Sequence, residues 1–337
     1  MKAVVIEKPG VVTIKDRPIP KLDSGFALVK VHAAAVCATD LEVIDGNIPA
    51  NYPLTPGHEW SGVVVDTADE CDKGWIGKRV IGSNDVVCLK CDACRSGNWR
   101  YCNDFEEIGF KRDGAYAEYV AVPTYGLYEI SDSLPFENAA LCEPLGVALG
   151  TLEKANAHFG DNLLIMGAGS IGLCVLSAAK AMGLSDIVVC AKSAKRLDKA
   201  KIIGADHVIA TDETDLEAEM KKIHPHGTDI IIDCTGIKSC IQSALRLAKK
   251  GGTVALAGYG RGKIMNIRID DIHIKNLSVV GAGNNWNYHK KAAKLMEQGK
   301  IDLTPFVSER LSLCDYQKAI DDARNRPVGF VKAVFEF

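Results

Sequence analysis

The stretch from residue 162 to residue 182 constrains the fold of this chain more than any other segment. A short apolar run, 163–166, leads into a Gly-x-Gly-x-x-Gly pattern, and an apolar helical stretch follows at once. Strand, glycine-rich turn and helix in this order are typical of a dinucleotide-binding loop, although glycines alone could mark a simple turn. The free N–H groups at such a helix start favour phosphate, and the glycines allow close approach. We therefore predict that the nucleotide is bound by Gly167, Gly169, Ser170, Ile171 and Gly172.

The bulk composition excludes several classes of function. A chain of 337 residues exceeds what one hydrophobic core usually holds, so we expect two domains. The net charge of −3 and the lack of a basic tract argue against a nucleic-acid partner. The first ten residues predict a strand and a turn instead of a signal peptide, and no apolar run approaches the length of a membrane span. Twelve cysteines without a secretory signal indicate a reducing compartment, so we expect a cytoplasmic protein with some cysteines on metal.

The order of predicted elements indicates an α/β protein. Up to about residue 126, short β runs at 3–6, 11–14, 27–33, 61–66, 79–81 and 117–122 suit a compact β barrel or sandwich. A helical period follows from 134 to 155. Six strands (163–166, 186–190, 207–209, 228–233, 252–257 and 277–280) then alternate with helices (170–182, 195–203, 216–223 and 238–249), which predicts a doubly wound parallel sheet. After a helix at 288–298, a β run at 329–337 is expected to return to the first domain.

Four closely spaced cysteines form the most specific pattern in the chain, and they are Cys88, Cys91, Cys94 and Cys102. Four thiolates in one polar loop suit a closed tetrahedral zinc site, which is structural because no coordination position is left open. Free thiols or an iron–sulfur cluster with similar spacing are the alternatives. Zinc is favoured because nothing around the loop suggests an electron-transfer partner.

A second set of possible metal ligands is scattered over three segments, which are Cys37-Ala38-Thr39-Asp40, Gly57-His58-Glu59 and Cys142-Glu143-Pro144. Each segment is unremarkable alone, since a lone cysteine is usually packed and a lone histidine is usually inert. Together they offer a thiolate, an imidazole and carboxylates. A catalytic zinc has three protein ligands and an open fourth position. It can polarise an alcohol oxygen while a nicotinamide accepts the hydride.

These motifs, in this order, resemble those of the zinc-dependent medium-chain alcohol dehydrogenase superfamily, nearest to the polyol (sorbitol-type) and threonine dehydrogenases. The resemblance covers essentially the whole chain. It implies a GroES-like β-barrel catalytic domain with the zinc lobe at 1–150, a Rossmann domain at 151–285 and a return segment at 286–337. It also implies an NAD(P)-dependent enzyme with one catalytic and one structural zinc, a small alcohol or carbonyl substrate, and a homodimer or homotetramer.

The resemblance further assigns roles to the scattered residues. Cys37 and His58 match the catalytic zinc ligands of the family. Glu59 matches a carboxylate that binds the zinc or lies beside it, and Glu143 matches one that binds the zinc or holds its water.

Two more residues match catalytic positions, and two depart from the pattern. Thr39 matches the hydroxyl that takes the substrate proton, and Asp40 matches the carboxylate that orients the histidine ligand. Ala38 offers no side chain to a pyrophosphate. Glu42 stands where threonine dehydrogenases often carry a histidine, which weakens the threonine interpretation.

The residue that follows the second strand of the parallel sheet bears on the choice between NAD and NADP. NAD-dependent folds carry an acidic side chain there, about 20 residues beyond the glycine motif, that binds the ribose hydroxyls. Ala191 occupies this position, and the next carboxylate is Asp198 within the predicted helix. Lys192, Lys195 and Arg196 could bind a 2′-phosphate, or could simply be solvated residues at a helix start. We expect NADP to be preferred, with Lys192 as the discriminating contact.

The leading prediction is reversible oxidation of a secondary alcohol in a polyol, sugar or sugar acid, with an amino-alcohol substrate as the runner-up. A reductase of activated alkenes or quinones on the same scaffold would lack the zinc ligands. A non-catalytic nucleotide sensor with a structural zinc would lack the scattered set. A zinc-ribbon nucleic-acid binder would need a basic face, but Asp92 and Asp104 accompany the basic residues of the cysteine loop.

Overall fold

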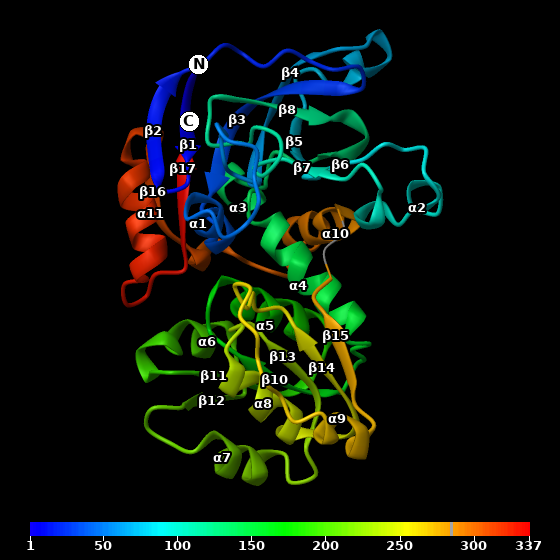
Figure 1. The fold of residues 1–337 in the computed structure, drawn as a ribbon, viewed down its shortest axis with the longest axis vertical. Coiled ribbons are helices and arrows are strands. Elements are labelled where there is room, and N and C mark those ends of the chain that lie inside the picture. Colours follow the sequence, from blue (N-terminus) through cyan, green and yellow to red (C-terminus); the bar gives the residue numbers. More distant parts are fainter. Residues whose placement is uncertain (284–285) are drawn as a thin grey trace. The chain divides into compact units, whose positions relative to one another are not determined.

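The computed structural model describes residues 1–283 and 286–337, without the side chains of Cys71 and Trp286. The chain divides into two compact units (Figure 1). The first comprises Met1–Gly146, Asn285–Gly299 and Leu303–Phe337, and the second comprises Val147–Asn284 and Lys300–Asp302. The domain boundaries expected at 150 and 285 stay predictions, and residue 285 lies outside the described residues.

The first unit is built on a seven-stranded sheet whose central strand is β3. The strand order is β16-β17-β3-β4-β5-β9, and β8 also pairs with β3. The bounds are β3 Phe26–Ala35, β4 Glu59–Thr67, β5 Arg79–Gly82, β8 Tyr119–Pro123, β9 Leu127–Glu129, β16 Val307–Leu311 and β17 Lys332–Glu336. β3 has room for three neighbours because β8 pairs with its first half and β17 with its last three residues. β17, the red strand of Figure 1, thus joins a sheet made mostly of residues from the first third of the chain.

Two short hairpin-like sheets and a set of helices complete the first unit. The sheets pair β1 Lys2–Lys8 with β2 Val11–Asp16 and β6 Asp85–Val86 with β7 Glu106–Glu107. The helices are α1 Ala38–Ile44, α2 Asp92–Arg95, α3 Phe136–Ala139, α10 Trp286–Glu297 and α11 Tyr316–Asn325. α4 Cys142–Lys154 begins in the first unit and continues into the second. The single helical stretch predicted at 134–155 is therefore two helices, α3 and α4, with a break between them.

The second unit confirms the predicted doubly wound sheet. Its six parallel strands lie in the order β12-β11-β10-β13-β14-β15. The chain first adds strands on one side of β10 and then continues with β13 on the other side, so the topological switch point lies between β10 and β13. The strands are β10 Asn162–Met166, β11 Ser185–Ala191, β12 His207–Ala210, β13 Thr228–Asp233, β14 Ala248–Leu256 and β15 Ser278–Gly281. The helices are α5 Ser170–Met182, α6 Asp198–Ile203, α7 Leu216–Ile223, α8 Lys238–Leu247 and α9 Asp270–Lys275. No helix of the described residues is both long enough and apolar enough to cross a membrane.

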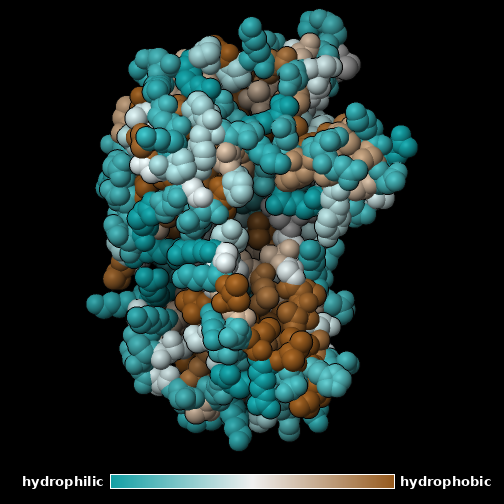
Figure 2. Space-filling model, in the orientation of Figure 1, coloured by the Kyte–Doolittle hydropathy of each residue, from teal (hydrophilic) through white to brown (hydrophobic). Residues whose placement is uncertain are grey.

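One edge of this sheet is open and apolar. β15 pairs with β14 and with no other strand of the described residues. Between residues 259 and 279 the chain exposes large apolar side chains, which are Tyr259, Ile264, Ile267, Ile269, Ile274 and Val279. Figure 2 shows brown, hydrophobic residues gathered over the part of the second unit where Figure 1 labels β14, β15 and α9.

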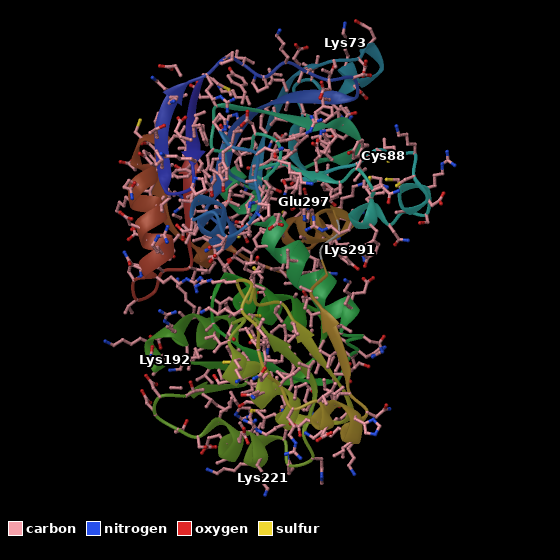
Figure 3. All side chains as sticks on the ribbon, viewed as in Figure 1. Lys73, Cys88, Lys192, Lys221, Lys291 and Glu297 are labelled. Carbon is pink, nitrogen blue, oxygen red and sulfur yellow. The ribbon has the colours of Figure 1, made fainter. Side chains whose placement is uncertain are left out.

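The segment between β6 and β7 forms a small lobe around the four spaced cysteines. The sulfur atoms of Cys88, Cys91, Cys94 and Cys102 all lie within 4.8 Å of one another, and Figure 3 shows sulfur atoms gathered beside Cys88. α2 begins directly after Cys91, and Cys102 directly follows a 3-10 turn at Trp99–Tyr101. Apart from the cysteines, the lobe core is small and includes Val87, Trp99 and Tyr125. Because so little apolar surface is buried, a metal on the four thiolates would supply much of the stability of the lobe.

The lobe gives a first test by mutation. Cys94→Ser removes one of four ligands, so we expect the zinc content to fall from about two to about one per chain. We also expect the melting temperature to fall, by about 2–4 °C for each kcal/mol lost. Metal analysis and thermal unfolding measure both effects. Cys314→Ser, which changes an exposed cysteine outside the lobe, is the control and should alter neither. Two zinc ions and an unchanged melting curve for Cys94→Ser would disprove the metal role of the lobe.

Candidate functional site

Cys37 lies where the central strand β3 gives way to α1. Its backbone is extended, with φ −98° and ψ 150°, and it caps the helix. The N–H of Cys37 donates to Oδ2 of Asp40, three residues ahead in the first turn, over 2.9 Å. This reciprocal arrangement is a capping box, which fixes the entry of the chain into a helix. The carboxylate of Asp40 therefore holds the backbone of Cys37 at the start of α1.

The same carboxylate holds His58. Oδ1 of Asp40 lies 3.1 Å from Nδ1 of His58, and the hydroxyl of Tyr116 donates to Oδ2 over 2.5 Å. Burial opposes ionisation of Asp40, but His58, Tyr116 and the Cys37 N–H outweigh it and lower the pKa of this carboxyl. Since an ionised carboxylate only accepts hydrogen bonds, His58 carries its proton on Nδ1. Nε2 is then the ring atom that could bind a metal, as in other carboxylate–histidine pairs.

Glu59 completes a three-residue group of possible ligands. A sulfur of Cys37, a ring nitrogen of His58 and a carboxylate oxygen of Glu59 lie within 4.8 Å of one another. Glu59 is the first residue of β4 and faces Ala35 at the end of β3, which brings it to the start of α1. His58 and Glu59 are buried, whereas Cys37 is only half-buried and so can be approached from solvent. A thiolate, an imidazole and a carboxylate are the donor types that zinc accepts.

Thr39 and Glu143 lie close to this group without belonging to it. The hydroxyl of Thr39 lies 3.4 Å from the sulfur of Cys37. Glu143, half-buried near the start of α4, is outside the 4.8 Å group. Burial and the charge of Glu59 raise the pKa of Glu143 to about 7, although His58 and Lys332 oppose this rise. The protonation of Glu143 therefore depends on the charges of His58 and Glu59 in the group.

Two neighbours of the group were not predicted from the sequence. The ring of Phe110 packs on His58 with centroids 5.2 Å apart. Lys332 of β17 lies with Nζ 2.5 and 2.6 Å from the two carboxylate oxygens of Glu59. Burial disfavours the ammonium, but the charges of Glu59 and Cys37 outweigh it and raise the pKa of Lys332. A lysine inside the apolar run 329–337 was a signal that could have indicated a buried anion.

The glycine-rich loop after β10 has a backbone that favours glycine at two of its positions. Gly167 has φ +107°, and a Cβ on Gly172 would lie 1.9 Å from the carbonyl oxygen of Gly167. A Cβ on Gly169 would meet nothing within 4 Å, which leaves space above the loop. The hydroxyl of Ser170 at the start of α5 is buried and lacks a partner among the described residues. It lies beside the free N–H groups of the first helical turn, which include that of Ile171, so these residues could hold phosphate.

The carboxyl end of β11 carries no acidic side chain. The strand ends at Ala191, and a 3-10 turn at Ala194–Arg196 separates it from α6. Lys192, Lys195 and Arg196 are all exposed, and Figure 3 labels Lys192 at the edge of the second unit. The helix expected to begin at 195 begins at Asp198 instead, because the turn takes up its first residues.

Comparisons with known proteins match this description. Residues 23–132 match the alcohol dehydrogenase GroES-like domain, and residues 170–298 match the zinc-binding dehydrogenase family. Sorbitol dehydrogenase of Bacillus subtilis (strain 168) is 30% identical over 329 residues, which cover 96% of this chain and 93% of that protein. L-Threonine 3-dehydrogenase of Pyrococcus horikoshii is 32% identical over 344 residues, which cover 99% and 98%.

Solved structures agree over the whole chain. A zinc-binding dehydrogenase from Sinorhizobium meliloti 1021 bound to NADP gives a TM-score of 0.91 at 30% identity, covering 100% of this chain and 99% of that one. An alcohol dehydrogenase from Escherichia coli CFT073 complexed with NADH gives 0.94 at 27% identity, with the same coverage. The chain belongs to the zinc-binding medium-chain dehydrogenases, and it is an NAD(P)-dependent dehydrogenase with a GroES-like and a Rossmann domain.

Proposed function

We propose that the protein reversibly oxidises a secondary alcohol of a polyol, sugar or sugar acid. The observation that carries this proposal is the buried Asp40, which holds both Cys37 and His58 in one group with Glu59. When bound there, zinc supplies a Lewis acid for the alcohol oxygen, and the nicotinamide supplies the hydride acceptor. The net change is one hydride to the cofactor and one proton to the protein or solvent.

The residues of the chain account for the proton side of this reaction. The Thr39 hydroxyl, beside the sulfur of Cys37, is the group we assign to take the substrate proton. Glu42 lies one helical turn further along α1, buried, with its carboxylate accepting from Nδ2 of Asn47 over 2.8 Å. Asp40 keeps the imidazole oriented while the charge in the site changes.

A polyol fits this chain better than an amino alcohol. Both sorbitol and threonine dehydrogenases are about equally similar to it. Glu42, however, is a carboxylate at the position where threonine dehydrogenases often carry a histidine. An amino alcohol is therefore kept as the second candidate, and a substrate panel can separate the two.

The chemistry is tested with Cys37→Ser and a panel of polyols, aldonates, inositols and amino alcohols, followed at the nicotinamide absorbance. We expect Cys37→Ser to abolish turnover while the fold persists, because a metal thiolate is lost. Asp40→Ala should lower activity by about 10–100-fold, as is typical for residues that orient a ligand. Cys314→Ser is the matched control. Full activity of Cys37→Ser would end the catalytic-zinc proposal, and turnover of threonine alone would end the polyol proposal.

We further propose that NADP is preferred over NAD. Ala191 removes both the usual partner of the ribose hydroxyls and the repulsion that would exclude a 2′-phosphate. Lys192, Lys195 and Arg196 are exposed at the same turn and can supply charge-assisted hydrogen bonds.

Steady-state kinetics with both cofactors test this preference. We expect a higher kcat/KM for NADP, with Lys192→Ala reducing the preference by about tenfold, or about 1.4 kcal/mol. Ala191→Asp should shift the enzyme towards NAD. Lys221→Ala, an exposed lysine of α7, serves as the control for a general loss of charge. A tenfold or so preference of the wild type for NAD would show that the role given to Ala191 is wrong.

The open edge at β15 supports a homodimer or homotetramer. An uncovered strand with apolar neighbours tends to pair with another chain. Exposed isoleucines from 264 to 274 lie between β14 and β15, next to that edge in sequence.

Light scattering at micromolar concentration tests the assembly. We expect the wild type to be an oligomer and Ile269→Glu or Ile274→Glu to dissociate it, because a charge would be buried at the contact. Ile202→Glu on α6 is the matched control, since Ile202 is 72% exposed and Ile269 is 71% exposed. A monomeric wild type would refute the proposal. Dissociation by Ile202→Glu alone would show that the contact between subunits does not lie at the β15 edge.

A further inference from the structure

The carboxylate of Asp233 is a buried charge in the second unit that the proposed chemistry does not use. Asp233 is the last residue of β13 and is fully buried. Its carboxylate accepts from the N–H and the hydroxyl of Thr235 over 3.2 and 2.5 Å, and from the N–H of Gly236 over 2.9 Å. Among the described residues, no lysine, arginine or histidine forms an ion pair with it. Burial raises the pKa of Asp233, and these three hydrogen bonds oppose the rise because they favour the ionised form.

Asp233 also joins the ends of β13 and β14. Its carbonyl oxygen accepts from the N–H of Gly258, just after β14, over 2.8 Å. The two strand ends touch, because a Cβ on Gly258 would lie 2.0 Å from the backbone nitrogen of Gly236. The turn after β13 also reaches the glycine-rich loop, since a Cβ on Gly167 would lie 3.0 Å from Cγ2 of Thr235. The negative charge of Asp233 is therefore fixed at the carboxyl ends of β10, β13 and β14.

A dinucleotide crosses a doubly wound sheet at the carboxyl ends of its strands, at the topological switch point. Here that point lies between β10 and β13. The pyrophosphate is expected at the loop that contains Gly167, and the adenosine half is expected beside Ala191 at the end of β11. The nicotinamide half must then extend to the other side, over the ends of β13 and β14. Those are the ends that Asp233 joins.

The nicotinamide ring changes its charge during the reaction. The oxidised ring is a cation, and it becomes neutral when it accepts a hydride, which carries one proton and two electrons. A fixed anion below a crevice with little water stabilises a cation and has little effect on a neutral ring.

We propose that Asp233 is a specificity-determining residue whose fixed negative charge favours binding of the oxidised cofactor over the reduced one. The inference rests on the NAD(P) dependence of the family, and neither on the proposed substrate nor on the proposed preference for NADP.

Cofactor binding without substrate tests this inference. The reduced cofactor is titrated by its own fluorescence, and the oxidised cofactor by displacement of the reduced one, with the NADP and NAD couples measured separately. Asp233→Asn removes the charge and keeps nearly the same shape. We expect the dissociation constant of the oxidised form to rise about tenfold, or about 1.4 kcal/mol, and that of the reduced form to change by less than about twofold.

Thr235→Val is the matched control, because it removes a hydrogen bond of the Asp233 carboxylate and keeps the charge. A loosened turn should weaken both forms of the cofactor alike, so the ratio of their dissociation constants should stay at the wild-type value. A rise of this ratio in Asp233→Asn alone would support the inference. An unchanged ratio in Asp233→Asn, or an equal rise in Thr235→Val, would overturn it and leave the proposed function intact.

A second measurement on the wild type keeps the inference testable if Asp233→Asn fails to fold. Benzamide adenine dinucleotide carries a neutral ring in place of the oxidised nicotinamide. Displacement of NADH should show NAD bound about tenfold more tightly than this analogue, because only NAD carries the ring charge. Equal affinities for the two would contradict the role given to Asp233.

Discussion

The first unit depends on one buried carboxylate, that of Asp40. It accepts from the backbone of Cys37, from His58 and from Tyr116, which come from three separate segments of the chain. A buried charge is tolerated only when its hydrogen-bonding capacity is used, and Asp40 meets this condition. Because one carboxylate bonds both the backbone of Cys37 and the imidazole of His58, these two candidate ligands share one support.

The strand pairing of the seven-stranded sheet brings Glu59 and Lys332 close to Cys37. Ala35 near the end of β3 pairs with Glu59 on one side and with Val334 of β17 on the other. Cys37 follows two residues later, and Lys332 lies two residues before Val334 in β17. Antiparallel pairing therefore brings the start of β4, the end of β3 and the start of β17 to one rim of the sheet. The ligand group and its ammonium are a consequence of strand register.

Local patterns in the sequence predicted the second unit better than the first. Strong periodicity gave the boundaries of α5 and α7 to the residue, and the glycine pattern located the loop after β10. α1 was missed because seven residues hold too few helical turns for a clear pattern. Donor chemistry suggested that Cys37, His58 and Glu59 belong together, but their ligand roles came from a family resemblance, since no spacing rule links them. Tyr116 and Lys332 act only through long-range contacts, which no local pattern encodes.

The long separation between Glu59 and Lys332 has a consequence for biosynthesis. The two residues are 273 positions apart, and the whole of Val147–Asn284 is translated between them. A ribosome therefore makes β3 and β4 long before the strand that must be inserted beside β3. Until β17 is made, only residues 33–35 at the end of β3 lack their neighbour on that edge. The Glu59 carboxylate then has no ammonium partner and must be hydrated by water. The first unit therefore completes its folding last, although its synthesis begins first. The nucleotide-binding unit can fold before β17 has been synthesised.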